Sequence, residues 1–265
     1  MQPIGSCLGD IIRRRVRGVA ELARGAHDTT VERASVTGAD GVEVPTIHAT
    51  PRGGAGGAGV VVHPDIMGVR PLFDDLCARI ASHGYAVACP EPFARAPADV
   101  RAAEDPSVRM GAMPELDDDL QLGDLTRAAE LLATHDGVEA VHVIGFCMGG
   151  MQTLKAATTG RFARAVPFYG MIRVPEAWSG ERLREPLDTA AEVCPTLAIF
   201  GSADPFTPPD DIDALRAAWS DRPDCEIVVY PDADHGFVHA PERPAHRPDD
   251  AADAWRRTLA WLAAG

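Results

Sequence analysis

The chain has 265 residues, of which 46% are hydrophobic and 24% are charged, and its formal net charge is -14. This composition is typical of an ordinary globular protein, with room for one large core or two small ones. The acidic balance argues against nucleic acid and anionic membranes as partners, because phosphate groups are bound by basic surfaces. No apolar run is long enough to span a bilayer, and the basic N-terminal cluster lacks the apolar core of a secretory signal.

The six cysteines are spread along the chain without a Cys-x-x-Cys pair, which indicates neither a zinc site nor a redox dithiol. Reduced thiols in apolar contexts are typical of the cytoplasm, which is the localisation that we predict. Residues 1–28 are interpreted as a leader segment, for which a short amphipathic helix and a flexible extension both remain open. Residues 29–265 are expected to form a single domain, because neither a repeat nor a linker divides them.

The first predicted elements are two strands between Glu32 and Thr50, joined by Gly38-Ala39-Asp40-Gly41, where Asp and Gly favour a turn. They predict an antiparallel hairpin. A glycine-rich surface loop follows at residues 52–59, without the spacing of a phosphate-binding loop.

The rest of the chain alternates apolar strands with amphipathic helices. Strands are expected at residues 59–63, 85–89, 141–144, 163–169, 195–200 and 226–230, and helices at 70–83, 116–135, after 147, and at 209–219 and 249–264. This rhythm predicts βαβ units, and therefore an α/β fold with a mostly parallel central sheet, helices on both faces and the antiparallel hairpin at the N-terminus. The Pro-, Ala- and charge-rich segment 95–115 is expected to lie near the strand ends.

One stretch combines a strand, a sharp corner and a helix. The apolar run from Val141 breaks into Gly145-Phe146-Cys147-Met148-Gly149 and continues as a helical pattern. This is the layout of a nucleophile elbow, in which small residues on both sides of the central residue permit the turn. A cysteine at a helix start is favoured as thiolate by free backbone N–H groups. Taken alone, the pattern is loose, and a small buried cysteine is an equally good interpretation of Cys147.

Three further polar side chains follow predicted strands, at the edge where open α/β sheets bind ligands. They are Asp65, Asp204 and His235. The order Cys147, Asp204, His235 is the nucleophile, acid and histidine order of α/β-hydrolases, in which the histidine moves protons and the acid orients its ring. Each residue also has a structural interpretation: Asp204 as a turn former before proline, His235 as a loop residue and Asp65 as a helix cap.

Together these segments resemble the dienelactone hydrolase family over nearly the whole chain from about Glu32. The matching motifs are Gly145-Phe146-Cys147-Met148-Gly149-Gly150, Gly201-Ser202-Ala203-Asp204-Pro205-Phe206-Thr207-Pro208 and Ala233-Asp234-His235-Gly236-Phe237. The resemblance implies an α/β-hydrolase that needs no metal or other cofactor. It would cleave a lactone or small carboxylic ester, with Cys147 as nucleophile, His235 as proton carrier and Asp204 as the orienting acid. A small-molecule substrate is the implied partner, and both a monomer and a homodimer remain open.

The hydrolase interpretation assigns supporting roles around the nucleophile. The backbone N–H groups of Met148 and Ile66 are expected to form the oxyanion hole. Asp65 stands where the family has a glutamate that supports the nucleophile, and its side chain is one methylene shorter. The resemblance therefore implies that Asp65 is a nucleophile-supporting carboxylate.

Substrate-binding roles also follow from the resemblance. Arg95 ends a Pro-Glu-Pro-Phe-Ala-Arg stretch similar to the family's Pro-Asp-Leu-Tyr-Ala-Arg, whose arginine binds a substrate carboxylate, and this implies an anionic substrate. Tyr169 is placed near the site, with a core tyrosine as the alternative. His239 stands where the dienelactone enzymes carry a second carboxylate-binding arginine, and Arg243 and Arg247 lie nearby as replacements.

Two other functions remain open. The departures at Asp65 and His239 are compatible with a binding or sensing module that has weak catalysis. A thiol-based redox function is a third hypothesis, in which Cys77 or Cys89 would approach Cys147 in space. A reactive thiol at Cys147 would favour the enzyme over the binding module.

Overall fold

The computed structural model describes residues 21–264, so most of the predicted leader, including Cys7, lies outside the described residues. Residues 21–28 form turns and irregular chain rather than a helix. The strands of the described chain are β1 (Thr29–Thr37), β2 (Glu43–Pro51), β3 (Ala58–His63), β4 (Ala86–Pro90), β5 (Ala140–Phe146), β6 (Ala165–Phe168), β7 (Thr196–Gly201) and β8 (Cys225–Tyr230).

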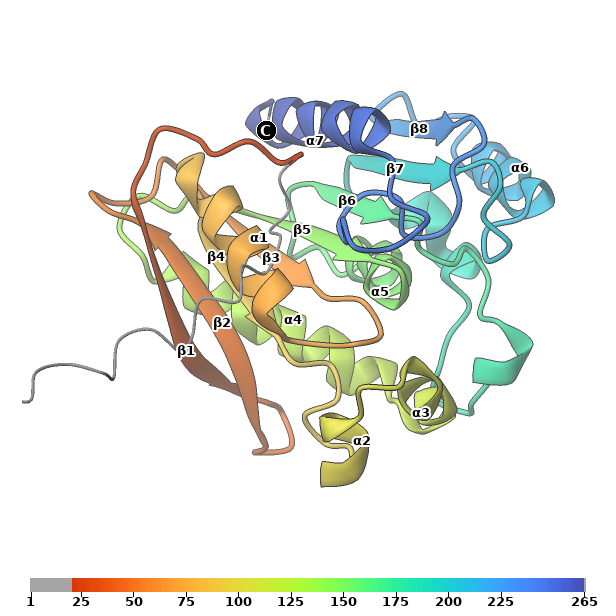
Figure 1. Ribbon diagram of the computed structural model, residues 1–265, viewed down its shortest axis with the longest axis horizontal. Coiled ribbons are helices and arrows are strands. Elements are labelled where there is room, and N and C mark those ends of the chain that lie inside the picture. Colours follow the sequence, from red (N-terminus) through yellow and green to blue (C-terminus); the bar gives the residue numbers. More distant parts are fainter. Residues whose placement is uncertain (1–20, 265) are drawn as a thin grey trace, which may run out of the picture.

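These strands form one sheet in the order β1-β2-β4-β3-β5-β6-β7-β8 (Figure 1). Strand β2 is antiparallel to both β1 and β4, whereas all pairs from β4 to β8 are parallel. The predicted hairpin is confirmed, because β1 and β2 pair along their whole length. Its turn is closed by Gly38 N, which donates to Val42 O over 2.8 Å, and Gly41 adopts a φ of 81° that favours glycine.

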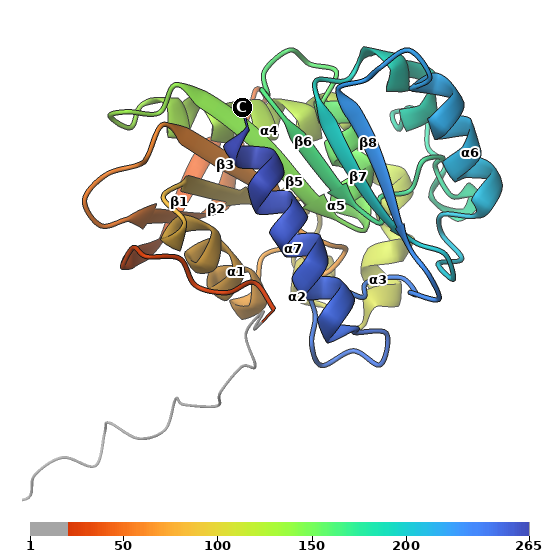
Figure 2. The same cartoon turned by 90° about the horizontal axis from the view of Figure 1, so that it is seen from above.

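Helices cover both faces of the sheet (Figure 2). One face carries α1 (Pro71–Ser82) and α7 (Pro248–Ala263), and the other carries α4 (Asp118–Ala133), α5 (Met148–Ala156) and α6 (Pro209–Ala218). Strand β3 shows why the central strands are apolar throughout. Val60 and Val62 join the core under α1 and α7, whereas Val61 joins the core under the other helices. The α/β fold with a mostly parallel sheet and helices on both faces, which the rhythm of strands and helices predicts, is therefore confirmed.

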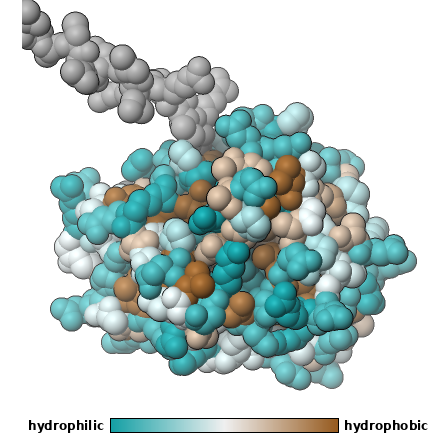
Figure 3. All heavy atoms as spheres, turned by 90° about the horizontal axis from the view of Figure 1, so that it is seen from below, coloured by the Kyte–Doolittle hydropathy of each residue, from teal (hydrophilic) through white to brown (hydrophobic). Residues whose placement is uncertain are grey.

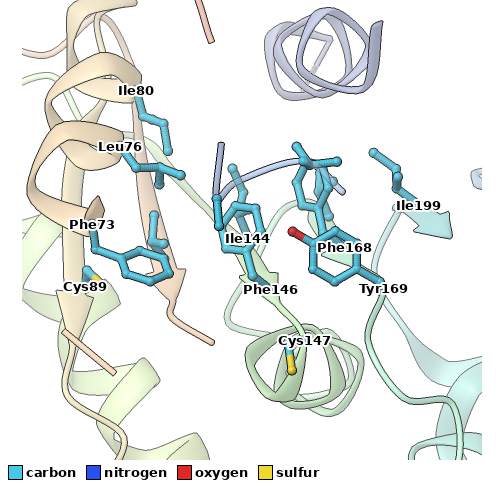
Figure 4. Packing of buried hydrophobic residues seen from close by; sticks show 14 of the residues in the cluster. Phe73, Leu76, Ile80, Cys89, Ile144, Phe146, Cys147, Phe168, Tyr169 and Ile199 are labelled. Atoms are coloured by element: carbon cyan, nitrogen blue, oxygen red, sulfur yellow. The ribbon is translucent and has the colours of Figure 1, made fainter. Parts of the chain in front are cut away.

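The core under α1 is rich in aromatic side chains. Figure 4 shows Phe73 and Leu76 of α1 directed toward Phe146, near the end of β5. Phe146 stacks on Phe168 of β6 with ring centroids 4.8 Å apart. This packing fixes the ends of two neighbouring strands directly beside Cys147, so the corner after β5 rests on a rigid support.

The segment after β4 contains short helices that the sequence pattern does not reveal. They are α2 (Ala98–Ala102), α3 (Pro106–Gly111) and a 3-10 turn at Met113–Glu115, and two more 3-10 turns follow β6 at Glu176–Trp178 and Pro186–Glu192. Helix α3 begins where Asp105 accepts a hydrogen bond from Ser107 N over 2.9 Å. Each of these short helices and 3-10 turns has too few residues to show a helical period in the sequence.

The face of the molecule shown in Figure 3 carries mostly hydrophilic residues, with hydrophobic residues in patches between them. Among residues 21–264, no helix has both the length and the apolar character needed to cross a membrane.

Candidate active site

A cavity of about 440 Å³ opens at the carboxyl ends of the parallel strands. Cys147 follows β5 directly, and His235 lies in the loop after β8; both side chains line this cavity. Asp65 and Ile66 reach it from the loop after β3. The structure thus brings together residues from three strand ends, as expected for a ligand site in an open α/β sheet.

Cys147 occupies a sharp corner between β5 and α5. Its φ of 59° and ψ of -121° lie where residues other than glycine are rarely found, so the surrounding structure holds it in a strained conformation. Gly149 permits the close approach of α5 to the loop after β3, because a Cβ there would lie 2.3 Å from His63 O and 2.4 Å from Pro64 O. The Cys147 side chain is consequently presented at the start of a helix, where free N–H groups stabilise a negative charge.

His235 and Asp204 form a buried pair beside this corner. His235 Nδ1 lies 2.8 Å from Asp204 Oδ2, and since a carboxylate accepts, Nδ1 carries the proton. Asp204 Oδ1 accepts a second hydrogen bond, from Phe206 N over 2.8 Å. Burial alone would lower the pKa of His235, but the neighbouring Cys147 sulfur and the Asp204 carboxylate raise it to about 10. The arrangement therefore favours a protonated imidazole next to the sulfur.

The free side of the imidazole faces the nucleophile candidate. His235 Nε2 is buried and has no hydrogen-bond partner of regular geometry within the described chain. The Cys147 sulfur is nevertheless close enough to interact with this ring electrostatically. A thiol and an imidazole in this relation can exchange a proton, which is the chemistry of an activated cysteine.

Asp65 is saturated by partners other than the thiol. Its Oδ1 accepts from Arg70 Nη1 over 2.6 Å and from Met67 N over 2.9 Å, and its Oδ2 accepts from Arg70 Nη2 over 2.7 Å and from His239 Nε2 over 2.7 Å. Although burial opposes it, these partners hold the pKa of the carboxyl far below its usual value. Within the described residues, Asp65 makes no hydrogen bond with Cys147. The described part of the chain shows no direct hydrogen bond for the implied role of Asp65 as a support of the nucleophile, and that role remains a prediction.

His239 and Tyr169 lie behind the cavity rather than in it. Both side chains are fully buried, neither lines the cavity, and the Tyr169 hydroxyl is hydrogen-bonded to His239 Nδ1. Burial raises the pKa of Tyr169 well above its ordinary value, so it remains a neutral phenol. This placement does not support the expectation that these two residues bind substrate, because neither side chain lines the cavity.

Arg95 does not line the Cys147 cavity. Its guanidinium is held by Asp40 of the hairpin turn, at 2.7 and 2.8 Å, and by Asp124 of α4, at 2.6 and 3.0 Å. It lines a different cavity, of about 510 Å³. This placement does not support the substrate-binding role implied for Arg95, because two carboxylates from distant parts of the chain hold its guanidinium and it does not line the Cys147 cavity.

Two other arginines reach the Cys147 cavity. Arg70 lines it beside Asp65, and Arg243 lines it from the loop between β8 and α7. Arg243 forms no ion pair with any residue of the described chain, whereas Arg247 pairs with Asp250 outside the cavity. Sequence reasoning missed Arg70, for which the available signal was an arginine at the start of α1, five residues after the carboxylate.

The two expected oxyanion donors are in suitable segments. Met148 is the first residue of α5, where a backbone N–H has no partner within the helix. Ile66 lines the cavity in the loop after β3, and Gly149 brings that loop against the start of α5. Their joint action on a substrate oxygen remains a prediction.

The parallel sheet with a strained elbow after β5 defines the class of the protein as an α/β-hydrolase fold. A family model described as the dienelactone hydrolase family matches residues 44–265. The chain belongs to this family and is accordingly a hydrolase of carboxylic esters or lactones.

Individual relatives agree with this placement. The Escherichia coli (strain K12) protein named "Putative carboxymethylenebutenolidase" is 32% identical over 227 residues, which cover 84% of this chain and 83% of that protein. The "Carboxymethylenebutenolidase" of Rhodococcus opacus is 29% identical over 222 residues, covering 82% of this chain and 84% of the relative. A crystal structure described as "Putative Dienelactone Hydrolase" from Klebsiella pneumoniae superposes with a TM-score of 0.80 at 30% identity, covering 89% of this chain and 98% of that one.

Proposed function

We propose that the protein hydrolyses a lactone or small carboxylic ester through an acyl-enzyme on Cys147. The observation that carries this proposal is the convergence of the Cys147 elbow and the His235–Asp204 pair on one cavity. A cysteine beside a proton carrier that is itself oriented by a carboxylate is the general arrangement for nucleophilic acyl transfer.

In the first half of the reaction, the Cys147 thiolate attacks the carbonyl carbon and forms a C–S bond. The electron pair of the C=O bond moves onto oxygen, where the N–H groups of Met148 and Ile66 stabilise the charge. When the tetrahedral intermediate collapses, the C–O bond to the leaving alkoxide breaks and the His235 imidazolium gives its proton to that oxygen. For a lactone the resulting alcohol remains part of the acyl group.

In the second half, water hydrolyses the thioester. Acylation removes the negative charge of the sulfur, which is one of the groups that raise the pKa of His235. The neutral imidazole can then take a proton from water, and the hydroxide equivalent attacks the acyl carbon. The C–S bond breaks, Cys147 leaves as thiolate and the imidazolium forms again. Asp204 keeps Nδ1 protonated throughout.

We further propose that the substrate carries a carboxylate, which Arg243 binds. Most of the cavity wall is apolar, with Ile66, Met110, Trp178 and Phe206 among its residues, so a cation without an ion-pair partner in the described chain is distinctive there. A charge-assisted hydrogen bond from a guanidinium would orient an anionic ligand. The name of the Rhodococcus relative denotes a lactone that carries a carboxymethylene group, which combines both features.

The cytoplasm remains the proposed location. All five cysteines of the described chain are free thiols, which supports a reducing compartment.

The nucleophile is tested with Cys147→Ala and, as a matched control, Cys225→Ala on β8, outside the cavity. Turnover of cis- and trans-dienelactone, aryl esters and thioesters, each with and without a free carboxylate, is measured for both variants and the parent. We expect Cys147→Ala to lose all detectable turnover and Cys225→Ala to keep it. An unchanged rate in Cys147→Ala would exclude the proposed mechanism. Absence of turnover in the parent on the whole panel, together with a thiol that resists iodoacetamide, would favour the binding module instead.

A further inference from the structure

The Asp65 carboxylate is the hydrogen-bond acceptor around which the loop between β3 and α1 is arranged. This carboxylate accepts from Met67 N within the loop and from both Nη atoms of Arg70 at the loop's end. These bonds are local, because they connect residues at most five positions apart. They fix the shape of the loop but not its distance from the rest of the site.

Among the described residues, His239 supplies the one long-range hydrogen bond of this carboxylate. Its Nε2 lies 2.7 Å from Asp65 Oδ2, although 174 residues separate the two in the chain. His239 is in turn the fourth residue after His235, in the loop between β8 and α7. The bond therefore joins the loop that carries the proposed proton carrier to the loop that carries Ile66, the proposed oxyanion donor.

His239 itself has little freedom to move. Its ring stacks on Phe146 with centroids 4.8 Å apart and lies near Phe73 and Tyr169, and its Nδ1 is hydrogen-bonded to the Tyr169 hydroxyl. With Tyr169 donating to Nδ1, Nε2 carries the proton and donates to Asp65, so the neutral ring satisfies both partners. An imidazole locked on both sides can set the position of the loop it contacts.

We propose that His239 is a positioning residue for the oxyanion hole, acting through Asp65 to hold the Ile66 loop against the elbow. This inference rests on the proposed esterase function, and it assigns His239 a role other than substrate binding. A direct substrate contact would require His239 to line the cavity, which it does not. Small errors in the placement of a catalytic group reduce the rate, whereas substrate affinity depends on the cavity wall.

The test compares His239→Phe with His239→Gln. Phenylalanine keeps the aromatic packing and removes both hydrogen bonds, whereas glutamine can still accept from Tyr169 and donate to Asp65. We expect His239→Phe to lower kcat by about tenfold to a hundredfold with KM nearly unchanged, and His239→Gln to recover most of that loss. His142→Phe is the matched control, because His142 is another fully buried histidine, and neither of its ring nitrogens has a hydrogen-bond partner within the described chain.

A second substrate distinguishes loop positioning from general disturbance. In a thionoester the developing charge falls on sulfur, a weaker hydrogen-bond acceptor, so an oxyanion hole contributes less to its turnover. We therefore expect the His239→Phe defect to be smaller for a thionoester than for the matching ester. In the double variant His239→Phe with Tyr169→Phe, no buried hydroxyl is left without a hydrogen-bond partner. It should show the same kcat defect, and it replaces the single variant in the test if the single variant folds poorly.

Three results would overturn the inference: kcat of His239→Phe within about twofold of the parent, an equal loss for His239→Gln, or equal defects on ester and thionoester. The rate of Cys147 alkylation by iodoacetamide should stay the same in His239→Phe, because the thiol and His235 are not altered. If Cys147→Ala abolished turnover while His239→Phe did not lower it, the positioning role would fail and the proposed function would stand.

Discussion

His235 Nδ1 and Asp204 Oδ2 lie 2.8 Å apart, on side chains that come from loops after different strands and are both almost fully buried. Burial opposes the charged imidazole, but the carboxylate and the nearby Cys147 sulfur outweigh it and raise the pKa of His235 to about 10. This environment favours the protonated imidazole, because the carboxylate and the sulfur both favour a positive charge on the ring.

The pH dependence of activity follows from this pKa. With a neutral ester as substrate, kcat/KM should fall on the alkaline side with a midpoint near 10, because the imidazolium needed to protonate the leaving group is lost there. A profile measured from pH 6 to about 11 checks this expectation. An alkaline limb near the ordinary histidine value of 6.5 would contradict it.

The same shift links folding to pH. Since the folded pKa of about 10 exceeds the ordinary value of 6.5, the imidazolium contributes stability that is fully present below pH 6.5 and is lost as the pH rises through about 10. The free energy of unfolding, measured with urea at pH 6, 8 and 10, should fall more steeply for the parent than for His235→Gln. Equal slopes in the two proteins would contradict the linkage.

Asp204→Asn removes the charge but keeps the size of the side chain. The amide no longer stabilises the imidazolium and no longer fixes the Nδ1–H tautomer, so we expect kcat to fall by about two to four orders of magnitude. Steady-state kinetics on an aryl ester would measure the loss, with Asp213→Asn on the exposed face of α6 as the control. A loss below about threefold would show that Asp204 does not orient His235.

Much of this architecture could be predicted from local sequence. The apolar strand at residues 59–63 can be recognised from consecutive residues, because a strand buried on both faces requires apolar side chains throughout. The Gly-x-Cys-x-Gly corner can be recognised in the same way, because the tight turn requires small residues at fixed positions. The order Cys147, Asp204, His235 was likewise visible, since parallel strands place their carboxyl ends at one edge.

The contacts of the charged side chains could not be predicted in this way. Arg95 matches a substrate-binding motif, yet Asp40 and Asp124, from distant elements, bind its guanidinium. By resemblance Asp65 stands at the position of a family glutamate, yet both of its oxygens accept from Arg70 and Oδ2 also accepts from His239. A long charged side chain has several possible partners, and distances in the folded structure decide which one it binds. The spacing of residues in the sequence does not predict these distances.

Arg243→Gln tests the proposed carboxylate contact. Loss of a charge-assisted hydrogen bond costs about 1.5 to 3 kcal/mol, so KM for an ester with a free carboxylate should rise by roughly tenfold to a hundredfold. KM for the matching neutral ester should stay nearly constant. The same measurement on Arg95→Gln should show little change in either KM, because Arg95 lies outside the cavity. If Arg95→Gln alone raised KM for the anionic ester, the placement of both arginines would be contradicted.

A buried ion pair joins Lys155 of α5, the helix that follows the Cys147 corner, to Asp118 at the start of α4. Lys155 Nζ lies 3.0 and 2.9 Å from the two Asp118 oxygens, which also accept from Gln152 Nε2 and Arg184 N. Burial lowers the pKa of Lys155, and Asp118 opposes this shift. The pair therefore connects α5, and with it the Cys147 corner, to two other segments.

Lys155→Met leaves the Asp118 carboxylate buried without its cation. Removing one partner of such a pair costs about 3 to 5 kcal/mol in the free energy of unfolding, whereas Arg161→Met, which breaks an exposed pair with Glu130, should cost at most about 1 kcal/mol. Urea unfolding at neutral pH would measure both. In the double variant Lys155→Met with Asp118→Asn, we expect part of the lost stability to return, because no uncompensated charge remains buried. If Lys155→Met were as stable as Arg161→Met, the ion pair would not be what holds the elbow helix in place.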